Sequence, residues 1–469
     1  MKEDILALDG TSLLAAYRNR TLSPAEVVDA VLAAIERDKA VNAFCLVDAD
    51  AARNAAKASE ARWMRGEPAS PVDGLPFTIK DALPWAGHPN RDGSRNTPAD
   101  PVPENAPSVE RLLNAGAVPV GKTTLSEFGW KAVGDSPLYG VTCNPWDTRM
   151  TSGGSSAGAG AAAALNLGVL HIGQDSAGSI RIPSAFCGTF GLKPSHGRVP
   201  LAPPMPFALI SDVGPMTRTV RDAALMLTIM AGPDPRDIGA IPTPPPDYRI
   251  GLDDGVRGLR MAWSPRLGFV KKVDAEVERI AAHAAKAFEE LYATVEEADP
   301  EWQDPIETIR LLWRVGCWSE LSSVPQDRWG ESDPGLVAFA QPGRDIKATE
   351  FVNGANGRTA LFQAMHQFHQ SFDILLTPTV ATAAFEAGHN TPPDGRFGDE
   401  WFNWATYSYP FDVTLQPAAT VPCGQTMAGL PVGLQIVAPY MQDDLVLRAA
   451  RAFESIRPWP TIAKPRIGH

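Results

Sequence analysis

Two turns built from small residues lie close together in the middle of the chain. The segment 151–160 holds three serines and four glycines in ten residues, and a second Ser/Gly turn spans 175–179. An alanine-rich helical stretch and the apolar strand 167–173 separate the two turns. Turns of this kind at strand and helix ends are where α/β folds place their chemistry. The pair therefore predicts an α/β fold whose reactive groups lie at these turns.

Local signals along the rest of the chain extend this alternation. Ser23, followed by Pro24 and then Glu26, is a capping-box pattern that predicts the start of a helix. The run 74–81 is typical of a strand that ends in two charges. We expect further helices at 49–64, 109–114, 219–230, 275–291 and 443–454, and further strands at 117–120, 372–377 and 432–437. Strands that alternate with helices indicate an α/β fold.

The charge balance narrows the class of partner. The 469 residues include 54 Asp and Glu against 42 Lys and Arg, a formal net charge of -12, and no basic run offsets it. Nucleic acid and anionic lipid both need basic patches, so an acidic surface disfavours unaided binding to either. We therefore expect a small-molecule partner, no nucleic acid and no membrane, and leave a homodimer open.

Cysteine usage and the N-terminal segment bear on the compartment. The five cysteines are widely spread, odd in number and without CxxC spacing: Cys45, Cys143, Cys187, Cys317 and Cys423. This spacing argues against a disulfide framework and fits a reducing compartment. The segment 1–20 lacks the apolar core of a signal peptide, and 158–173 has the wrong length and character for a membrane span. A cytoplasmic location is therefore expected.

One short motif suggests nucleotide binding. Gly116–Thr123 matches the phosphate-loop expression GxxxxGK[ST]. A phosphate loop needs a flexible turn whose amides curl around an anion. Here the interior is strand-like, Pro119 lacks an amide, and the preceding segment looks helical. A P-loop nucleotide-binding protein is therefore a disfavoured alternative.

A second motif suggests an esterase. Gly154–Gly158 matches GxSxG, the nucleophile elbow of α/β-hydrolases, which would make Ser156 the nucleophile. The elbow must follow a buried strand, yet 144–151 is polar. Of the downstream histidines, His389 has the least unsuitable surroundings, in a Gly/Asn/Pro loop. This GxSxG interpretation is the second disfavoured alternative.

A metal site receives little support. His366 and His369 lie three residues apart on a predicted helix, but no neighbouring carboxylate is placed as a third ligand. We expect an ordinary polar helix face, no metal and no cofactor.

A series of long blocks carries a stronger signal. GLPFTIKDAL, NAGAVPVGKTTLSEFG, NPWDTRMTSGGSSAG, GQDSAGSIRIPSAFCGTFGLKPSHGRV and GPMTRTVRDAALML follow one another within 74–227, and FDILLTPTV and LPVGLQIVAP lie near the C-terminus. In this order the blocks resemble the amidase signature family. The resemblance implies one domain over 1–469, with a mixed central β-sheet flanked by α-helices on both faces. It also implies variable, lid-forming segments at about 300–370 and 385–410.

The resemblance implies roles for single residues. It makes Ser179 the nucleophile, Ser155 the bridging serine, which in the family follows a cis peptide bond, and Lys80 the terminal base. The other implied site residues are the oxyanion-hole donors Ser176, Ala177 and Gly178 and the substrate-binding residues Gly129, Trp130 and Ser156. Ala177 departs from the family, which commonly has glycine there, and this puts the substrate range in doubt.

These residue types suit the hydrolysis of an amide. A serine hydroxyl attacks only when a base takes its proton, and lysine is a base only when neutral. Burial at a strand end favours neutral Lys80, so Asp81 is expected to point away from it. Ser155 would pass the proton from Ser179 to Lys80 and later to the departing nitrogen.

Family membership does not fix the substrate. Trp130 lies between matched blocks that border the acyl pocket in relatives, and four more tryptophans lie in unmatched segments: Trp313, Trp318, Trp401 and Trp404. Each tryptophan belongs either to the core or to the cleft, because tryptophan is highly buried on average but also lines binding sites. Cleft tryptophans would favour an apolar or aryl amide, anilide or carbamate. The alternative within the family is the amidase subunit of a tRNA-dependent amidotransferase, which would require partner subunits.

Overall fold

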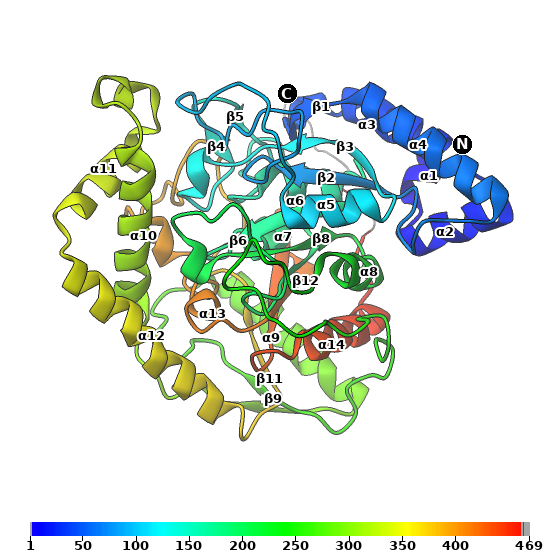
Figure 1. Ribbon diagram of the computed structural model, residues 1–469. Coiled ribbons are helices and arrows are strands. Elements are labelled where there is room, and N and C mark those ends of the chain that lie inside the picture. Colours follow the sequence, from blue (N-terminus) through cyan, green and yellow to red (C-terminus); the bar gives the residue numbers. More distant parts are fainter. Residues whose placement is uncertain (1, 461–462, 464–469) are drawn as a thin grey trace.

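An eleven-stranded mixed sheet runs through the centre of the molecule (Figure 1). The computed structural model describes residues 2–460 and 463. The strand order is β1-β3-β2-β6-β8-β7-β12-β13-β11-β9-β10. The strands are β1 (Phe44–Val47), β2 (Pro76–Lys80), β3 (Val118–Thr123), β6 (Leu170–Asp175), β7 (Phe190–Lys193), β8 (Asp212–Thr217), β9 (Arg260–Trp263), β10 (Thr294–Glu297), β11 (Ile374–Pro378), β12 (Ala418–Gln425) and β13 (Pro431–Val437). A separate two-stranded ribbon pairs β4 (Asp135–Ser136) with β5 (Gly140–Val141).

Strand directions change along the sheet. Strand β2 runs parallel to both β3 and β6, and β9 runs parallel to β10 and β11. Between these parallel groups, the pairs from β6 through β8, β7, β12 and β13 to β11 are antiparallel. The mixed α/β sheet expected from the family resemblance is confirmed.

Helices cover both faces of the sheet. They are α1 (Lys2–Ala7), α2 (Gly10–Asn19), α3 (Pro24–Arg37), α4 (Ala49–Arg65), α5 (Pro107–Asn114), α6 (Ala157–Ala164), α7 (Arg181–Cys187), α8 (Val220–Met230), α9 (Ala275–Lys286), α10 (Ile306–Ser322), α11 (Pro334–Ala340), α12 (Ala348–Phe368), α13 (Pro410–Val413) and α14 (Asp443–Ile456). Helices α1–α4 and α10–α12 lie at opposite flanks of the molecule (Figure 1).

Strand β11 shows how the two faces are built. Ile374 and Leu376 belong to a hydrophobic core that includes residues of α8 and α14, whereas Leu375 belongs to a second core with residues of α7 and α10. Successive strand residues point to opposite faces. The sheet is therefore buried on both sides, and its strands β2, β6, β7, β8, β11 and β13 are buried at every position.

Most predicted elements are present, with shifted ends. The capping box at Ser23 forms as expected, with Ser23 and Glu26 bonding reciprocally at the start of α3. The strand expected at 117–120 continues to Thr123 as β3. The helix expected at 275–291 ends as an α-helix at Lys286 and continues as a 3-10 turn.

The cysteines and the helices bear on the expected compartment. All five cysteines have free thiols, in agreement with the absence of a disulfide framework expected from their spacing. Within the described residues, no helix combines the length and the low polarity needed to cross a membrane.

Candidate active site

Lys80 ends the fully buried strand β2 and is itself almost inaccessible. Its Nζ donates to Ser155 Oγ at 2.8 Å and to the Gln174 carbonyl at 3.3 Å. Burial lowers the pKa of Lys80 to about 8, although the charges of Asp92 and Asp175 oppose this shift. A substantial share of Lys80 is therefore neutral slightly above neutral pH, and neutral lysine can accept a proton.

Ser155 lies where glycines leave room for it. The peptide bond between Gly154 and Ser155 is cis. A Cβ on Gly154 would come within 2.5 Å of the Val133 carbonyl oxygen, and one on Gly129 would lie 3.2 Å from Ser155 Oγ. The segment containing Gly129 therefore lies close to the Ser155 hydroxyl, and the predicted contact of Gly129 with substrate stays a prediction.

Ser179 belongs to the turn between β6 and α7 and is 7% exposed. Its carbonyl accepts a hydrogen bond from the Ser156 N–H at 3.2 Å. This contact holds the backbone of Ser179 against the residue that follows Ser155. The structure thus brings the three predicted catalytic residues into one buried place, although their roles stay predictions.

Asp175 organises the turn that carries Ser179. Its carboxylate accepts from the N–H groups of Gly178 and, at 3.0 Å, of Ile180. The Gly178 amide, one of the three predicted oxyanion-hole donors, is thus engaged by Asp175. In the described part of the chain, the amides of Ser176, Ala177 and Ser179 donate to no protein acceptor. The predicted roles of Ser176, Ala177 and Gly178 as oxyanion donors stay predictions.

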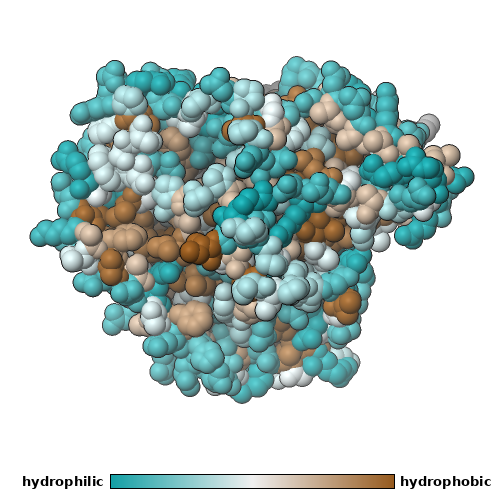
Figure 2. All heavy atoms as spheres, viewed as in Figure 1, coloured by the Kyte–Doolittle hydropathy of each residue, from teal (hydrophilic) through white to brown (hydrophobic). Residues whose placement is uncertain are grey.

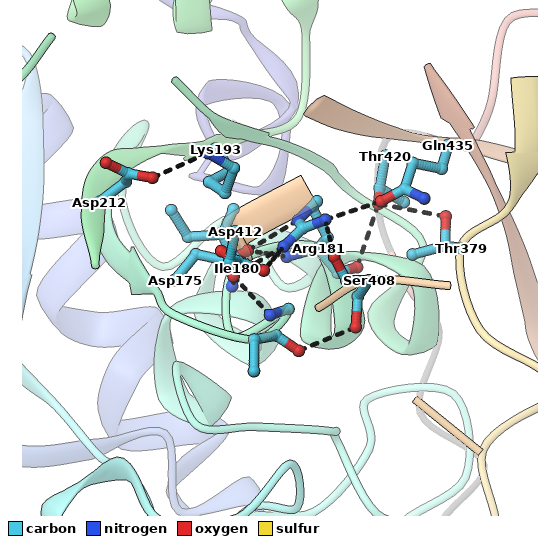
Figure 3. A network of polar contacts seen from close by, with 12 residues as sticks. Asp175, Ile180, Arg181, Lys193, Asp212, Thr379, Ser408, Asp412, Thr420 and Gln435 are labelled. Carbon is cyan, nitrogen blue, oxygen red and sulfur yellow. Dashed lines mark hydrogen bonds and ion pairs between the residues drawn. The ribbon is translucent and has the colours of Figure 1, made fainter. Parts of the chain in front are cut away.

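A buried network anchors this turn from behind (Figure 3). Arg181 forms ion pairs with Asp175 and Asp412, and all three side chains are inaccessible. Burial alone would raise the pKa of Asp175. The positive charge and the hydrogen bonds of Arg181 have a larger effect, so the pKa of Asp175 lies below its usual range. Arg181 also donates to the Ser408 carbonyl at 2.7 Å, and Ser408 Oγ donates to the Ala177 carbonyl at 2.8 Å. The turn that carries Ser179 is therefore fixed to the chain around 408–412.

Asp412 and Ser408 were not foreseen from the sequence. Both lie more than two hundred residues after the turn they contact, with separations of 231 for the Arg181–Asp412 and the Ser408–Ala177 bonds. No local pattern signals a partner at that distance.

Asp81 lies away from the proposed base, as expected. Its carboxylate pairs with Lys122 Nζ at 2.8 Å and accepts from the Tyr139 hydroxyl at 2.6 Å. Lys122 is fully buried in strand β3. The segment that matches the phosphate-loop expression therefore forms a strand after a helix, and its lysine serves an internal ion pair.

Ser156 occupies a structural position. Its hydroxyl donates to the Gln174 carbonyl at 3.1 Å and accepts from the Gln174 N–H at 3.2 Å. The residues 144–151 form turns and isolated bridges, so no buried strand leads into the GxSxG sequence. His389 lies exposed on a loop. The elbow hypothesis thus lacks its structural context, and the predicted contact of Ser156 with substrate stays a prediction.

His369 is engaged by neighbouring protein groups. Its Nδ1 contacts the Phe372 carbonyl at 2.9 Å, and its Nε2 contacts the Gln416 side-chain nitrogen at 2.8 Å. Burial lowers the pKa of His369 to about 4. Among the described residues, no group of three metal-ligating side chains occurs.

The tryptophans of the variable segments are mainly core residues. Trp313, Trp401 and Trp404 are buried in the second hydrophobic core. Trp313 stacks on Phe207 at 4.4 Å and donates to the Trp130 carbonyl at 2.7 Å. These contacts fasten α10 to the segment that lies close to Ser155.

Known proteins resemble this chain over nearly its whole length. The protein family described as Amidase matches residues 26–327 and 341–447. An acylamidase of Rhodococcus erythropolis is 38% identical, with 96% of each chain covered. A glutamyl-tRNA(Gln) amidotransferase subunit of Anaeromyxobacter sp. (strain K) is 34% identical, with 95% of this chain and 96% of that one covered. The crystal structure of a bacterial aryl acylamidase of the amidase signature family superimposes with a TM-score of 0.90, at 28% identity and 96% coverage of both chains.

Proposed function

Because the chain belongs to the amidase signature family and is an amide-cleaving hydrolase, we propose that it works through an acyl-enzyme on Ser179. One observation carries this proposal. The buried Lys80 ammonium or amine lies 2.8 Å from Ser155 Oγ, beside the turn that bears Ser179. A nucleophile, a bridging hydroxyl and a titratable base thus adjoin one another without a histidine.

The proposed reaction follows from these positions. Neutral Lys80 takes a proton from Ser155, which takes one from Ser179, and Ser179 Oγ attacks the carbonyl carbon. The amides of Ser176, Ala177 and Ser179, which donate to no protein acceptor, stabilise the oxyanion. The tetrahedral intermediate expels the nitrogen after Ser155 protonates it, and water then hydrolyses the ester on Ser179 along the same proton path.

We propose an apolar or aryl amide, anilide or carbamate as the substrate. Support comes from the acylamidase relative and from the similarity to an aryl acylamidase structure. On the face seen in Figure 2, hydrophobic residues gather beside α10, toward the centre of the molecule. An apolar surface of this kind suits contact with an apolar acyl or aryl group.

A hydrolysis screen tests the substrate class. Purified enzyme is offered matched acyl anilides, aliphatic amides, ureas and carbamates, with Ser179→Ala as the background control. We expect anilides to exceed free glutamine in kcat/KM by about a hundred-fold or more, because burying an aryl ring adds apolar contact that glutamine lacks. Rates no higher than those of the control on the anilides, on the apolar amides and on the carbamates alike would contradict the proposal.

The amidase component of a tRNA-dependent amidotransferase is the second candidate, favoured by the 34% identical relative. It would act on glutamine and need partner subunits. Glutamine hydrolysis that appears only when such subunits are added would favour it over the acylamidase.

We also propose that the chain is one domain located in the cytoplasm, and that the variable segments at about 300–370 and 385–410 form a lid over the active site. Three contacts of the first segment support this lid. Trp313 donates to the Trp130 carbonyl, Asn96 to Ser332 Oγ at 2.8 Å, and the Asp333 N–H to Glu127 at 2.6 Å.

Ser408→Ala is expected to lower kcat about ten-fold with little change in KM. The peptide between Ala177 and Gly178 is held at its N–H by Asp175 and at its carbonyl by Ser408. Losing one such hydrogen bond costs about 1 kcal/mol and frees the turn that presents the oxyanion donors. Steady-state kinetics on an anilide measures the effect, with the exposed Ser322→Ala as the matched control. An unchanged kcat in a folded Ser408→Ala enzyme would show that this contact does not position the turn.

A further inference from the structure

A short turn beside the proposed bridging serine has a backbone that must be held in place. Glu127–Gly129 forms a 3-10 turn in which Phe128 has a φ of 49° and Gly129 a φ of 66°. A Cβ on Gly129 would lie 3.2 Å from Ser155 Oγ. Because Phe128 is not glycine, its left-handed conformation costs free energy and persists only where surrounding contacts enforce it. The contacts that hold this turn therefore set the space around the Ser155 hydroxyl.

The Glu127 side chain joins the turn to the proposed lid segment at about 300–370, here called the first lid segment. Glu127 is buried, and its two carboxylate oxygens accept from the Ser94 hydroxyl and from the Asp333 N–H, each at 2.6 Å. An N–H that donates to a buried carboxylate forms a charge-assisted hydrogen bond, which is stronger than a neutral one. Glu127 thus ties the turn beside the serine to the residue that precedes α11.

An ion pair makes a second connection between the same two parts of the chain. Lys131 Nζ lies 2.7 Å from Asp333 Oδ2 and 2.7 Å from Asp135 Oδ2. The Lys131 side chain is 4% exposed, so the pair is largely shielded from water. Asp135 lies only four residues after Lys131, so the Asp333 pair alone crosses to the first lid segment. The other Asp333 oxygen, Oδ1, accepts from the Gly335 N–H at 2.8 Å and caps α11.

Helices α10 and α11 also cover the residue between Gly129 and Lys131. A Cβ on Gly335 would lie 2.7 Å from two ring carbons of Trp130, so α11 packs closely against this ring. The Trp130 carbonyl accepts from Trp313 of α10 at 2.7 Å. Hydrogen bond, ion pair and ring contact therefore join one short stretch of chain beside the serine to one lid segment.

We propose that Glu127, Lys131 and Asp333 are positioning residues through which the first lid segment holds the turn against the Ser155 hydroxyl. This inference rests on the proposed function, in which Ser155 carries the proton. The three side chains act on geometry alone, without touching the substrate or taking a proton. Geometry is sufficient for a large effect, because a displacement of about 1 Å in a reacting group can cost roughly a hundred-fold in rate.

The first experiment compares two carboxylates that pair with the same lysine at the same distance. Asp333→Asn removes the pair that crosses to the lid segment and keeps an oxygen to cap α11. Asp135→Asn removes the pair within the Lys131 segment and leaves the crossing pair intact. We expect Asp333→Asn to lower kcat/KM on an acyl anilide about ten- to hundred-fold, mainly through kcat, the effect of a lost hydrogen bond to a charged group. Asp135→Asn should stay near the wild-type value.

Glu127 offers a test by conservative rescue. Glu127→Ala loses both side-chain hydrogen bonds and should lower kcat/KM about ten- to hundred-fold. In Glu127→Gln the amide oxygen can still accept from the Asp333 N–H, and the amide nitrogen can donate to the Ser94 hydroxyl. Most of the lost rate should therefore return. A glutamine variant as slow as the alanine variant would mean that the carboxyl acts through its charge or its proton, which contradicts a positioning role.

Hydrogen–deuterium exchange separates this inference from the proposed function. The Gly129 and Trp130 N–H groups donate to carbonyls three residues earlier, at 2.9 Å and 3.1 Å. Asp333→Asn should raise the exchange rate of these amides about ten-fold, whereas Asp135→Asn should not. Failure of the wild type to cleave any anilide would refute the proposed substrate class, and the exchange rates would still test the connection.

Two results would overturn the inference. One is equal exchange, or equal kcat/KM, in the Asp333→Asn and Asp135→Asn variants. The other is faster exchange in Asp333→Asn together with wild-type kcat/KM, because the first lid segment would then hold the turn without affecting the reaction.

Discussion

Replacing Ser179 by alanine is expected to lower kcat by roughly 10⁴- to 10⁶-fold, the loss typical of a missing catalytic serine. In the proposed reaction only Ser179 forms the bond to the acyl carbon. The substitution removes one oxygen from a residue whose backbone is held by Ser156 and whose turn is fixed by Asp175. The fold should therefore persist while turnover stops.

Ser156→Ala is the matched comparison. Ser156 neighbours Ser155, and its hydroxyl bonds both polar groups of the Gln174 backbone. We expect this variant to lose some stability and to keep measurable turnover. Circular dichroism and thermal unfolding establish that both variants fold. Wild-type rates in Ser179→Ala, with turnover lost in Ser156→Ala, would restore the elbow hypothesis.

Lys80→Ala is expected to lower kcat/KM by about a thousand-fold, the usual scale of a lost general base. The same hypothesis predicts the pH profile of the wild type. Below a pKa of about 8 the ammonium form dominates and cannot accept a proton. The logarithm of kcat/KM should therefore rise with slope one up to about pH 8 and level off above it. Exposed Lys57→Ala is the control and should match wild type.

A flat profile between about pH 6 and about pH 9 would contradict a titrating Lys80. So would a profile that falls over this range, because the sign of the effect depends on neutral lysine being the active form. A profile retained in Lys80→Ala would assign the titration to another group.

Local sequence signals predicted much of the fold. The capping pattern at Ser23 involves groups three residues apart and forms in α3 as expected. The apolar run before Lys80 is strand β2, buried throughout. Helix ends were less predictable, because an isolated sequence does not show where tertiary packing stops a helix. Helix α9 ends at Lys286, although the periodic pattern continues for a further turn.

The candidate site was predictable only where ordered family blocks covered it. Lys80, Ser155 and Ser179 lie within those blocks. Ser408 and Asp412 lie outside them, and their contacts with the turn that carries Ser179 arise from folding distant segments together.

Short motifs did not predict the local structure, and the reason is physical. Gly116–Thr123 satisfies the phosphate-loop expression letter by letter, yet its interior favours an extended backbone and forms β3. A motif specifies residue types, whereas anion binding depends on a turn whose amides converge. The longer blocks succeeded because they specify both the residues and the elements that carry them.

Covalent labelling tests the central claim most directly. Wild-type enzyme is treated with a fluorophosphonate, which reacts with activated serines, and the modified peptide is mapped by mass spectrometry. We predict one phosphonyl group on Ser179, with labelling that is lost in Ser179→Ala and strongly slowed in Lys80→Ala. Labelling of Ser156 or of Ser155, with Ser179 unmodified, would contradict the proposed mechanism.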